Sequence, residues 1–101
     1  MPLALEAQGN DARARLDGEL TVFNVADIYP ELLGLLEYER VTLDLSELIE
    51  LDGCGAQLLA ILQIEAQRED NEIVLQRPTP AVARTLHAMC MRFDANATEE
   101  Y

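Results

Sequence analysis

The feature that most constrains the fold is the segment from Leu51 to Ala56, which ends in four small residues and separates two apolar segments. Residues 41–45 before it alternate apolar and polar side chains, as is typical of a strand, and residues 58–66 after it are apolar on more than one helical stripe. Two glycines and a cysteine leave the first N–H groups of the predicted helix uncovered. The segment from Leu51 to Ala56 therefore either satisfies the geometry of a tight strand-to-helix turn or opens the helix end to an anion or a protein partner.

The N-terminal segment predicts a β-hairpin. Residues 3–7 and 12–16 alternate apolar with polar side chains, and Gly9-Asn10-Asp11 between them has turn chemistry. Residues 17–19 interrupt the second strand, which we expect to resume from Leu20 to Phe23.

Two further helices are predicted from their start signals. Pro30 is harmless only in a first helical turn, so Asp27 is expected to cap a helix that runs from Ile28 to about Glu39. Pro78-Thr79-Pro80 predicts another helix start, with Thr79 as the N-cap. The apolar face expected on this last helix consists of Val82, Leu86, Met89, Cys90 and Phe93.

The order of these elements predicts an α/β fold. With a short buried strand at residues 73–75, the order is strand, strand, helix, strand, helix, strand, helix. Alternating strands and helices imply parallel crossovers. We expect a mixed sheet of about four to five strands with helices packed mainly on one face. A chain of 101 residues is one domain, here residues 1–94, and the unpatterned residues 95–101 are expected to be a frayed tail.

The charge and the cysteine count exclude several functions. Nineteen acidic and seven basic residues give a formal net charge of −12, which repels nucleic acid and anionic lipid. The acidic side chains either form a solvated surface that serves solubility or steer the domain toward a basic patch on a protein partner. Cys54, Cys90 and His87 are too few ligands for a structural zinc site, and both cysteines are expected as reduced thiols. No segment has the length and apolarity of a membrane helix and the N-terminus lacks a basic signal region, so we expect a cytoplasmic protein.

Four short segments together resemble the STAS domain family, named for sulphate transporters and anti-sigma factor antagonists. They are Gly18-Glu19-Leu20, Asp44-Leu45-Ser46, Leu51-Asp52-Gly53-Cys54-Gly55 and Pro78-Thr79-Pro80, and they follow the family's order over nearly the whole chain. The resemblance implies a STAS-like fold and a non-enzymatic interaction module whose partner is often an ATP-dependent serine kinase that acts as an anti-sigma factor. Asp44 and Asp52 have no nucleophile or oxyanion hole beside them in the sequence, so we expect no catalysis, cofactor or metal.

The chain departs from the family pattern at the residue that follows Asp52. In the family a serine or threonine there is phosphorylated, and the added charge of about −2 breaks the complex by repulsion and desolvation. Gly53 has no hydroxyl, and the thiol of Cys54 is not a normal substrate for a serine kinase. We therefore expect no phosphorylation at this turn, and either constitutive binding or control through the availability of the partner.

These considerations predict a docking surface around the turn. Its candidate residues are Asp52, Gly53, Cys54 and Gly55, with Gln57 and Leu58 on the following helix and Asp27 at the start of the first helix. Asp52 either caps the helix or meets a cation of the partner, and the two roles can coexist. The expected function is that of a bacterial, anti-sigma factor antagonist-like signalling regulator of transcription. Its partner is expected to be a serine kinase-like ATPase or another regulator. The alternatives are a STAS subunit of a lipid-transporting ABC complex and a chemotaxis-associated STAS protein; weak homodimerisation stays open.

Overall fold

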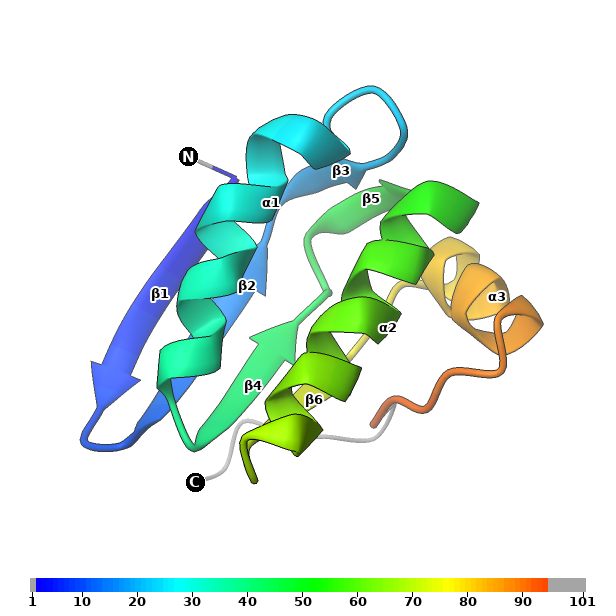
Figure 1. The fold of residues 1–101 in the computed structure, drawn as a ribbon. Helices are drawn as coiled ribbons and strands as arrows, with labels where there is room; N and C mark the ends of the chain where they lie inside the picture. Colours follow the sequence, from blue (N-terminus) through cyan, green and yellow to red (C-terminus); the bar gives the residue numbers. More distant parts are fainter. Residues whose placement is uncertain (1, 95–101) are drawn as a thin grey trace.

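A four-stranded mixed sheet forms the centre of the computed structural model, which describes residues 2–94. Its strands are β1 (Leu3–Gln8), β2 (Asp11–Leu16), β4 (Arg40–Asp44) and β6 (Glu72–Gln76), in the spatial order β1-β2-β4-β6 (Figure 1). β1 and β2 form an antiparallel hairpin, and β2, β4 and β6 run parallel. The hairpin, the central strand and the mixed α/β class predicted from the sequence are confirmed.

A second, two-stranded sheet lies beyond the end of β2 and β4 (Figure 1). It pairs β3 (Gly18–Leu20) in parallel with β5 (Leu48–Leu51). The predicted continuation of the second strand to Phe23 is wrong. Gly18 has a φ of +83° where the chain turns into this separate sheet, and β3 ends at Leu20 because the N–H groups of Asn24 and Val25 both donate to the carbonyl of Thr21 in a tight turn. β5 was not predicted, since its two buried leucines are separated by two exposed residues and give no alternation.

Two helices cover one face of the four-stranded sheet, as predicted (Figure 1). They are α1 (Val25–Leu33), which continues into the short 3₁₀ helix η1 (Gly34–Glu37), and α2 (Gly53–Arg68). The third helix, α3 (Pro80–Ala88), packs against β5. Between the sheet and helices α1 and α2 lies the core, which includes Ala14, Leu16, Val41, Leu43 and Leu75 from strands and Leu32, Leu59 and Leu62 from helices.

The start of α1 differs from the prediction. Asn24, and not Asp27, is the residue that precedes the helix, and Asp27 lies in the first helical turn. The reason is a tight turn in which the N–H groups of Asn24 and Val25 both donate to the carbonyl of Thr21, so the chain is already coiled before Asp27. Pro30 therefore lies inside the helix, where it removes one backbone hydrogen bond.

The end of α3 also differs from the prediction. Thr79 caps the helix as expected, with its hydroxyl accepting the N–H of Val82 at 3.3 Å, but the helix stops at Ala88. Cys90 adopts a left-handed φ of +58°, and the N–H of Met91 donates to the carbonyl of Leu86 at 2.9 Å. This is the Schellman arrangement that usually has glycine in the left-handed position. Consequently Met89 and Cys90 are exposed and do not extend the predicted apolar face.

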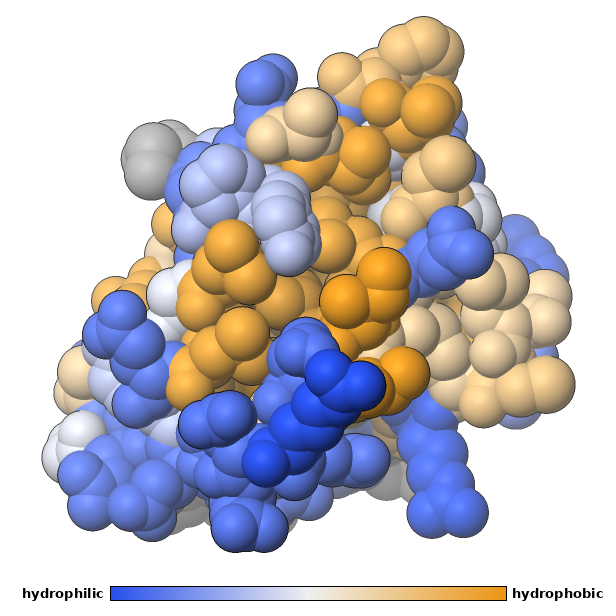
Figure 2. Space-filling model, viewed as in Figure 1, coloured by the Kyte–Doolittle hydropathy of each residue, from blue (hydrophilic) through white to orange (hydrophobic). Residues whose placement is uncertain are grey.

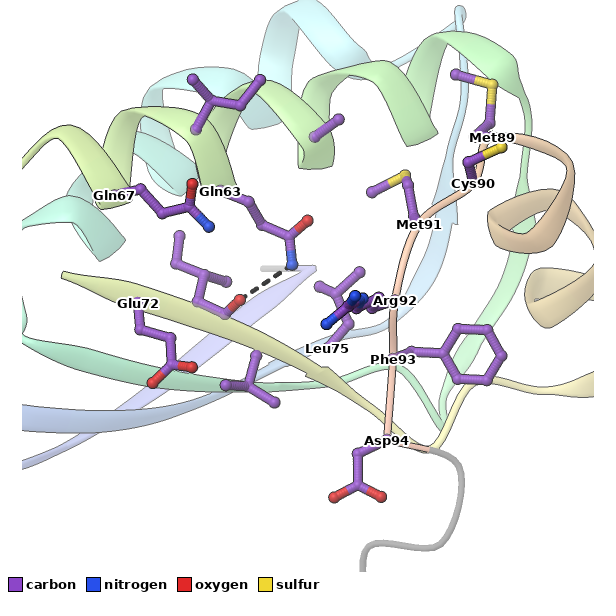
Figure 3. A pocket seen from close by; sticks show the side chains of 14 residues that line it. Gln63, Gln67, Glu72, Leu75, Met89, Cys90, Met91, Arg92, Phe93 and Asp94 are labelled. Atoms are coloured by element: carbon purple, nitrogen blue, oxygen red, sulfur yellow. Dashed lines mark hydrogen bonds between the residues drawn. The ribbon is translucent and has the colours of Figure 1, made fainter. Parts of the chain in front are cut away.

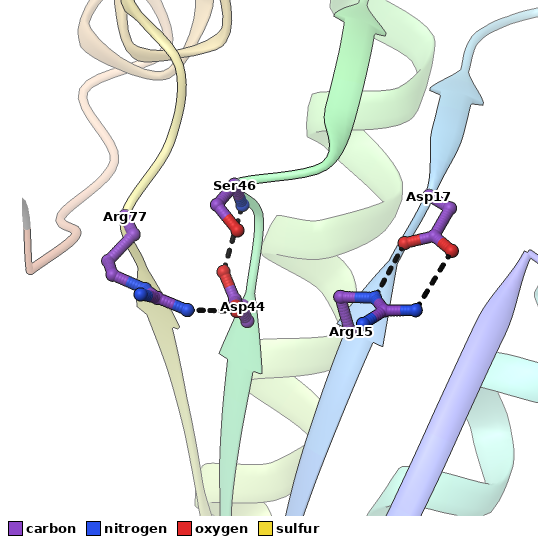
Figure 4. A network of polar contacts seen from close by, with 5 residues as sticks. All are labelled: Arg15, Asp17, Asp44, Ser46 and Arg77. Carbon is purple, nitrogen blue, oxygen red and sulfur yellow. Dashed lines mark hydrogen bonds and ion pairs between the residues drawn. The ribbon is translucent and has the colours of Figure 1, made fainter. Parts of the chain in front are cut away.

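A polar network fixes the end of the central strand, from which the chain leads to β5 and α2 (Figure 4). The carboxylate of Asp44 accepts the N–H of Ser46 at 2.9 Å and pairs with the guanidinium of Arg77 after β6. Burial raises the pKa of Asp44, but the Ser46 hydrogen bonds and Arg77 outweigh this and hold the pKa below its ordinary value. On the neighbouring strand, Arg15 donates to Asp17 at 2.8 and 3.2 Å.

Candidate docking site at the start of α2

Asp52 is the N-cap of α2 and joins that helix to a distant loop. Its Oδ1 accepts the N–H of Gly55 at 2.9 Å, which confirms the predicted cap, and its Oδ2 accepts the N–H of Val22 at 2.9 Å. These two hydrogen bonds, first the one from Gly55 and then the one from Val22, lower the pKa of Asp52. The carboxylate therefore stays ionised at neutral pH and ties the start of α2 to the loop that precedes α1.

The two glycines of the turn have different structural roles. Gly55 is buried, and a Cβ on it would lie 2.0 Å from the carbonyl oxygen of Leu20, so only glycine allows α2 to approach β3 this closely. Gly53 is exposed, and a Cβ on it would meet nothing within 4 Å. Gly55 thus shapes the turn from within, and Gly53 is open to solvent.

A shallow apolar groove of about 330 Å³ begins beside this turn and follows the contact between α1 and α2. From α2 it is lined by Cys54, Gln57, Leu58 and Ile61, and from α1 by Val25, Ala26 and Tyr29. Cys54 and Gln57 are exposed, and Leu58 is nearly buried. Figure 2 shows apolar side chains gathered over this face of the two helices. The structure therefore brings three of the predicted residues to one groove.

Asp27 does not line the groove. It lies exposed in the first turn of α1, where its charge is favourable to the helix dipole. Asp27 lies in the first turn of α1 and Gly53 is the first residue of α2, and the two helices begin at the same end of the helix layer (Figure 1).

Two exposed apolar residues beside the turn were not predicted from the sequence. Val22 and Phe23 lie in the loop between β3 and α1 and are 56% and 89% exposed. They were expected in a strand. Asn24 was the sequence signal that could have placed them in a loop, since asparagine favours turns and its side chain accepts the N–H of Thr21 directly after β3.

A larger hollow of about 680 Å³ lies on the other side of α2, between β6 and residues 89–94 (Figure 3). The amide of Gln63 donates to the carbonyl of Ile73 at 3.0 Å and so covers part of the edge of β6. Met89, Cys90 and Met91 line this hollow, and no histidine does. A thiol without a neighbouring base is not a catalytic set, and the hollow does not adjoin the Asp52 turn.

The described residues contain no metal-binding cluster, no disulfide and no helix able to span a membrane. Within residues 2–94, no three histidine, cysteine or acidic side chains are placed to hold a metal ion. Cys54 and Cys90 are both free and exposed thiols. None of the described helices has the length and apolarity needed to cross a membrane. The predicted frayed segment, residues 95–101, lies outside the described residues.

Comparison with known proteins gives one family and several similar folds. The family model described as "Mlab, STAS domain" matches residues 3–92. The anti-sigma factor antagonist SpoIIAA in its unphosphorylated form is 21% identical, with a TM-score of 0.77 over 96% of this chain and 89% of that one. The phosphorylated form of the Bacillus cell fate determinant SpoIIAA is 20% identical, with a TM-score of 0.70 over 96% and 92%.

A third similar structure is an anti-sigma factor antagonist from Mycobacterium paratuberculosis. It is 14% identical, with a TM-score of 0.75 over 91% of this chain and 83% of that one. No curated protein matches the chain. At these identities the likenesses to solved structures show the fold.

Proposed function

Because this chain belongs to the STAS domain family, we propose that it is a non-enzymatic interaction module that docks on a regulatory protein through the start of α2. Its role is that of an anti-sigma factor antagonist, and its partner is a serine kinase-like ATPase or a related regulator. The observation that carries the proposal is the exposed first residue of α2, Gly53, which stands between the Asp52 cap and the apolar groove.

The surface combines features of protein interfaces. Ile61 and Tyr29 are 48% and 41% exposed and supply apolar area in the groove, and the exposed amide of Gln57 lies in its lining. An apolar centre with a polar rim is the usual anatomy of a protein interface. The rigid helix ends hold this surface in place, so docking needs little rearrangement of the chain.

The proposed complex is not regulated by phosphorylation at the position that the family uses. Gly53 offers no hydroxyl to a kinase. Two hydroxyls elsewhere in the fold already have structural roles: Thr21 is buried and donates to Glu19, and Thr79 caps α3. The proposed complex is therefore constitutive, or it responds to the amount and state of the partner.

Affinity purification from the native cell, followed by binding measurements with the purified partner, tests this function. The Cβ introduced by Gly53→Arg meets no atom within 4 Å, and the long side chain is expected to block the surface and abolish binding. Gln67→Arg, on an exposed position in the last turn of the same helix, is the matched control and is expected to bind like the wild type.

The identity of the partner decides between signalling and transport. A partner with a kinase-like ATP-binding fold supports the proposal. Stable co-purification with an ATPase and a permease would replace it with a transporter subunit. Equal binding by both arginine variants would show that the interface lies elsewhere.

A further inference from the structure

We propose that Phe23 is an anchor residue of this docking surface and that it inserts into an apolar pocket with a basic rim on the partner protein. The proposal rests on the proposed function and names the chemistry of the partner. Phe23 is 89% exposed, more than any other large apolar residue among those described. Leaving an aromatic ring in water forgoes a large burial free energy, and buried aromatic residues dominate the energetics of interfaces.

The loop that carries Phe23 is held in one conformation by its neighbours. Thr21 is only 2% exposed, and its hydroxyl accepts the N–H of Phe23 at 3.2 Å. Oδ1 of Asn24 accepts the N–H of Thr21 at 2.9 Å, and the Asn24 amide donates to the carbonyl of Glu19 at 2.8 Å. An exposed ring on a preorganised loop binds with a smaller loss of conformational entropy than one on a mobile loop.

The position of the loop makes it continuous with the groove. The N–H of Val22 donates to Asp52, the cap of α2, and Val25 at the start of α1 lines the groove. The loop also projects from the end of the molecule at which α2 begins (Figure 1). A partner seated on Gly53 and the groove therefore meets Phe23 at the margin of the same contact. Asp52 acts as a positioning residue for the loop.

The charge of the surface around Phe23 indicates which kind of partner surface would bind it. The chain contains no lysine, and residues 16–39 and 41–67, which include β3, α1, β5 and the start of α2, contain no arginine. Glu19, Asp27 and Glu50 in these segments are exposed. Glu19 and Glu50 are direct neighbours across the β3–β5 pair. An acidic surface around an apolar anchor is complementary to an apolar pocket rimmed by arginine or lysine.

Photocrosslinking in the native cell tests the anchor. The full chain carries the photoreactive residue p-benzoyl-phenylalanine in place of Phe23, of Gln57 in the groove, or of Leu5 on β1 as a control. We expect adducts from positions 23 and 57 to the same protein and none from position 5. We also expect the peptide attached at position 23 to be apolar and to adjoin arginine or lysine in the partner.

The other outcomes separate this proposal from the proposed function. Adducts from position 57 alone overturn the anchor and leave the docking surface standing. Adducts from neither position overturn both. An adduct at position 23 to lipid, or to an acidic peptide, also overturns the anchor.

Binding to the purified partner gives a second, quantitative test. Phe23→Ala is expected to weaken affinity about 10- to 100-fold with no loss of thermal stability, as for an interface hot spot. Leu5→Ala, which also truncates a partly exposed apolar residue, is expected to leave affinity unchanged. Glu50→Lys is expected to slow association and to weaken its dependence on salt. Unchanged affinity of Phe23→Ala overturns the proposal.

Discussion

Asp52 accepts the N–H of Gly55 with one carboxylate oxygen and the N–H of Val22 with the other, both at 2.9 Å. One side chain thereby caps α2 and fixes the loop before α1, two segments that are 30 residues apart in the sequence. The docking surface that we propose depends on this link, because α2 supplies the turn and the groove while the loop supplies Phe23.

Removal of the Asp52 carboxylate is expected to loosen both segments. Asp52→Ala should lower the melting temperature more than Asp52→Asn, since asparagine is also a good N-cap but is uncharged. Hydrogen–deuterium exchange should become faster at Val22 and Gly55 in Asp52→Ala. Glu50→Ala, at an exposed acidic residue in β5, serves as the control and should leave the exchange of both amides unchanged. Unaltered protection of Val22 in Asp52→Ala would contradict the link.

Acid should destabilise the protein through Asp44. The pKa of Asp44 in the folded chain lies below its ordinary value, so the unfolded chain binds more protons in this range and stability rises with pH. The contribution is complete above the unfolded pKa of about 3.9 and is lost as the pH falls through the folded pKa. Urea unfolding measured between pH 2 and 7 should therefore show a stability loss at the acid end that is smaller in Asp44→Asn.

At neutral pH Asp44→Asn is expected to cost about 0.5–1.5 kcal/mol, because the ion pair with Arg77 is partly exposed and screened. Asp17→Asn removes the more exposed pair with Arg15 and should cost less than Asp44→Asn, because solvent screens an exposed pair more strongly. Equal losses in the two variants would mean that the network at the end of β4 has no special role in stability.

Alanine substitutions at the two glycines of the turn are expected to have opposite effects on the stability of the fold. Gly55→Ala places a Cβ 2.0 Å from the carbonyl oxygen of Leu20 and forces α2 away from β3, so it should destabilise the fold by about 1–3 kcal/mol or more. Gly53→Ala meets no atom within 4 Å and reduces the freedom of the unfolded chain, so it should be neutral or stabilising by up to about 1 kcal/mol. Chemical denaturation measures both variants. A tolerated Gly55→Ala would contradict the close approach.

The sequence predicted the elements with a clear hydrophobic period. Val41 and Leu43 alternate with polar residues because β4 has one face in the core, and the cap residues Asp52 and Thr79 were predicted because their side chains bond within three residues. Such signals are local. The sheet class followed from the order of these elements.

What the sequence did not predict depends on contacts between distant segments. β5 is a strand because it pairs with β3, although its own side chains do not alternate. α1 begins where it does because of the turn at Thr21, and Asp52 holds the loop that contains this turn. α3 ends at Ala88 because Cys90 adopts a left-handed conformation in which glycine is usual. Phe23 was missed for the same reason, since its exposure follows from where β3 ends.

The phosphoswitch prediction can be tested at Gly53 itself. Gly53→Ser introduces the hydroxyl found in the family into open space, so the variant should fold as the wild type does. Incubated with the cognate kinase and ATP, the wild type should show no added phosphate by intact mass and Gly53→Ser should gain one. A phosphate of charge about −2 on an already acidic surface should then weaken partner binding by repulsion, and Gly53→Asp should weaken it to a lesser extent. Gly53→Ala is the control, because it adds a side chain without a hydroxyl. Phosphate on a wild-type residue near the turn would contradict the absence of the switch, whereas an unmodified Gly53→Ser would show that the surrounding surface no longer presents this position to a kinase.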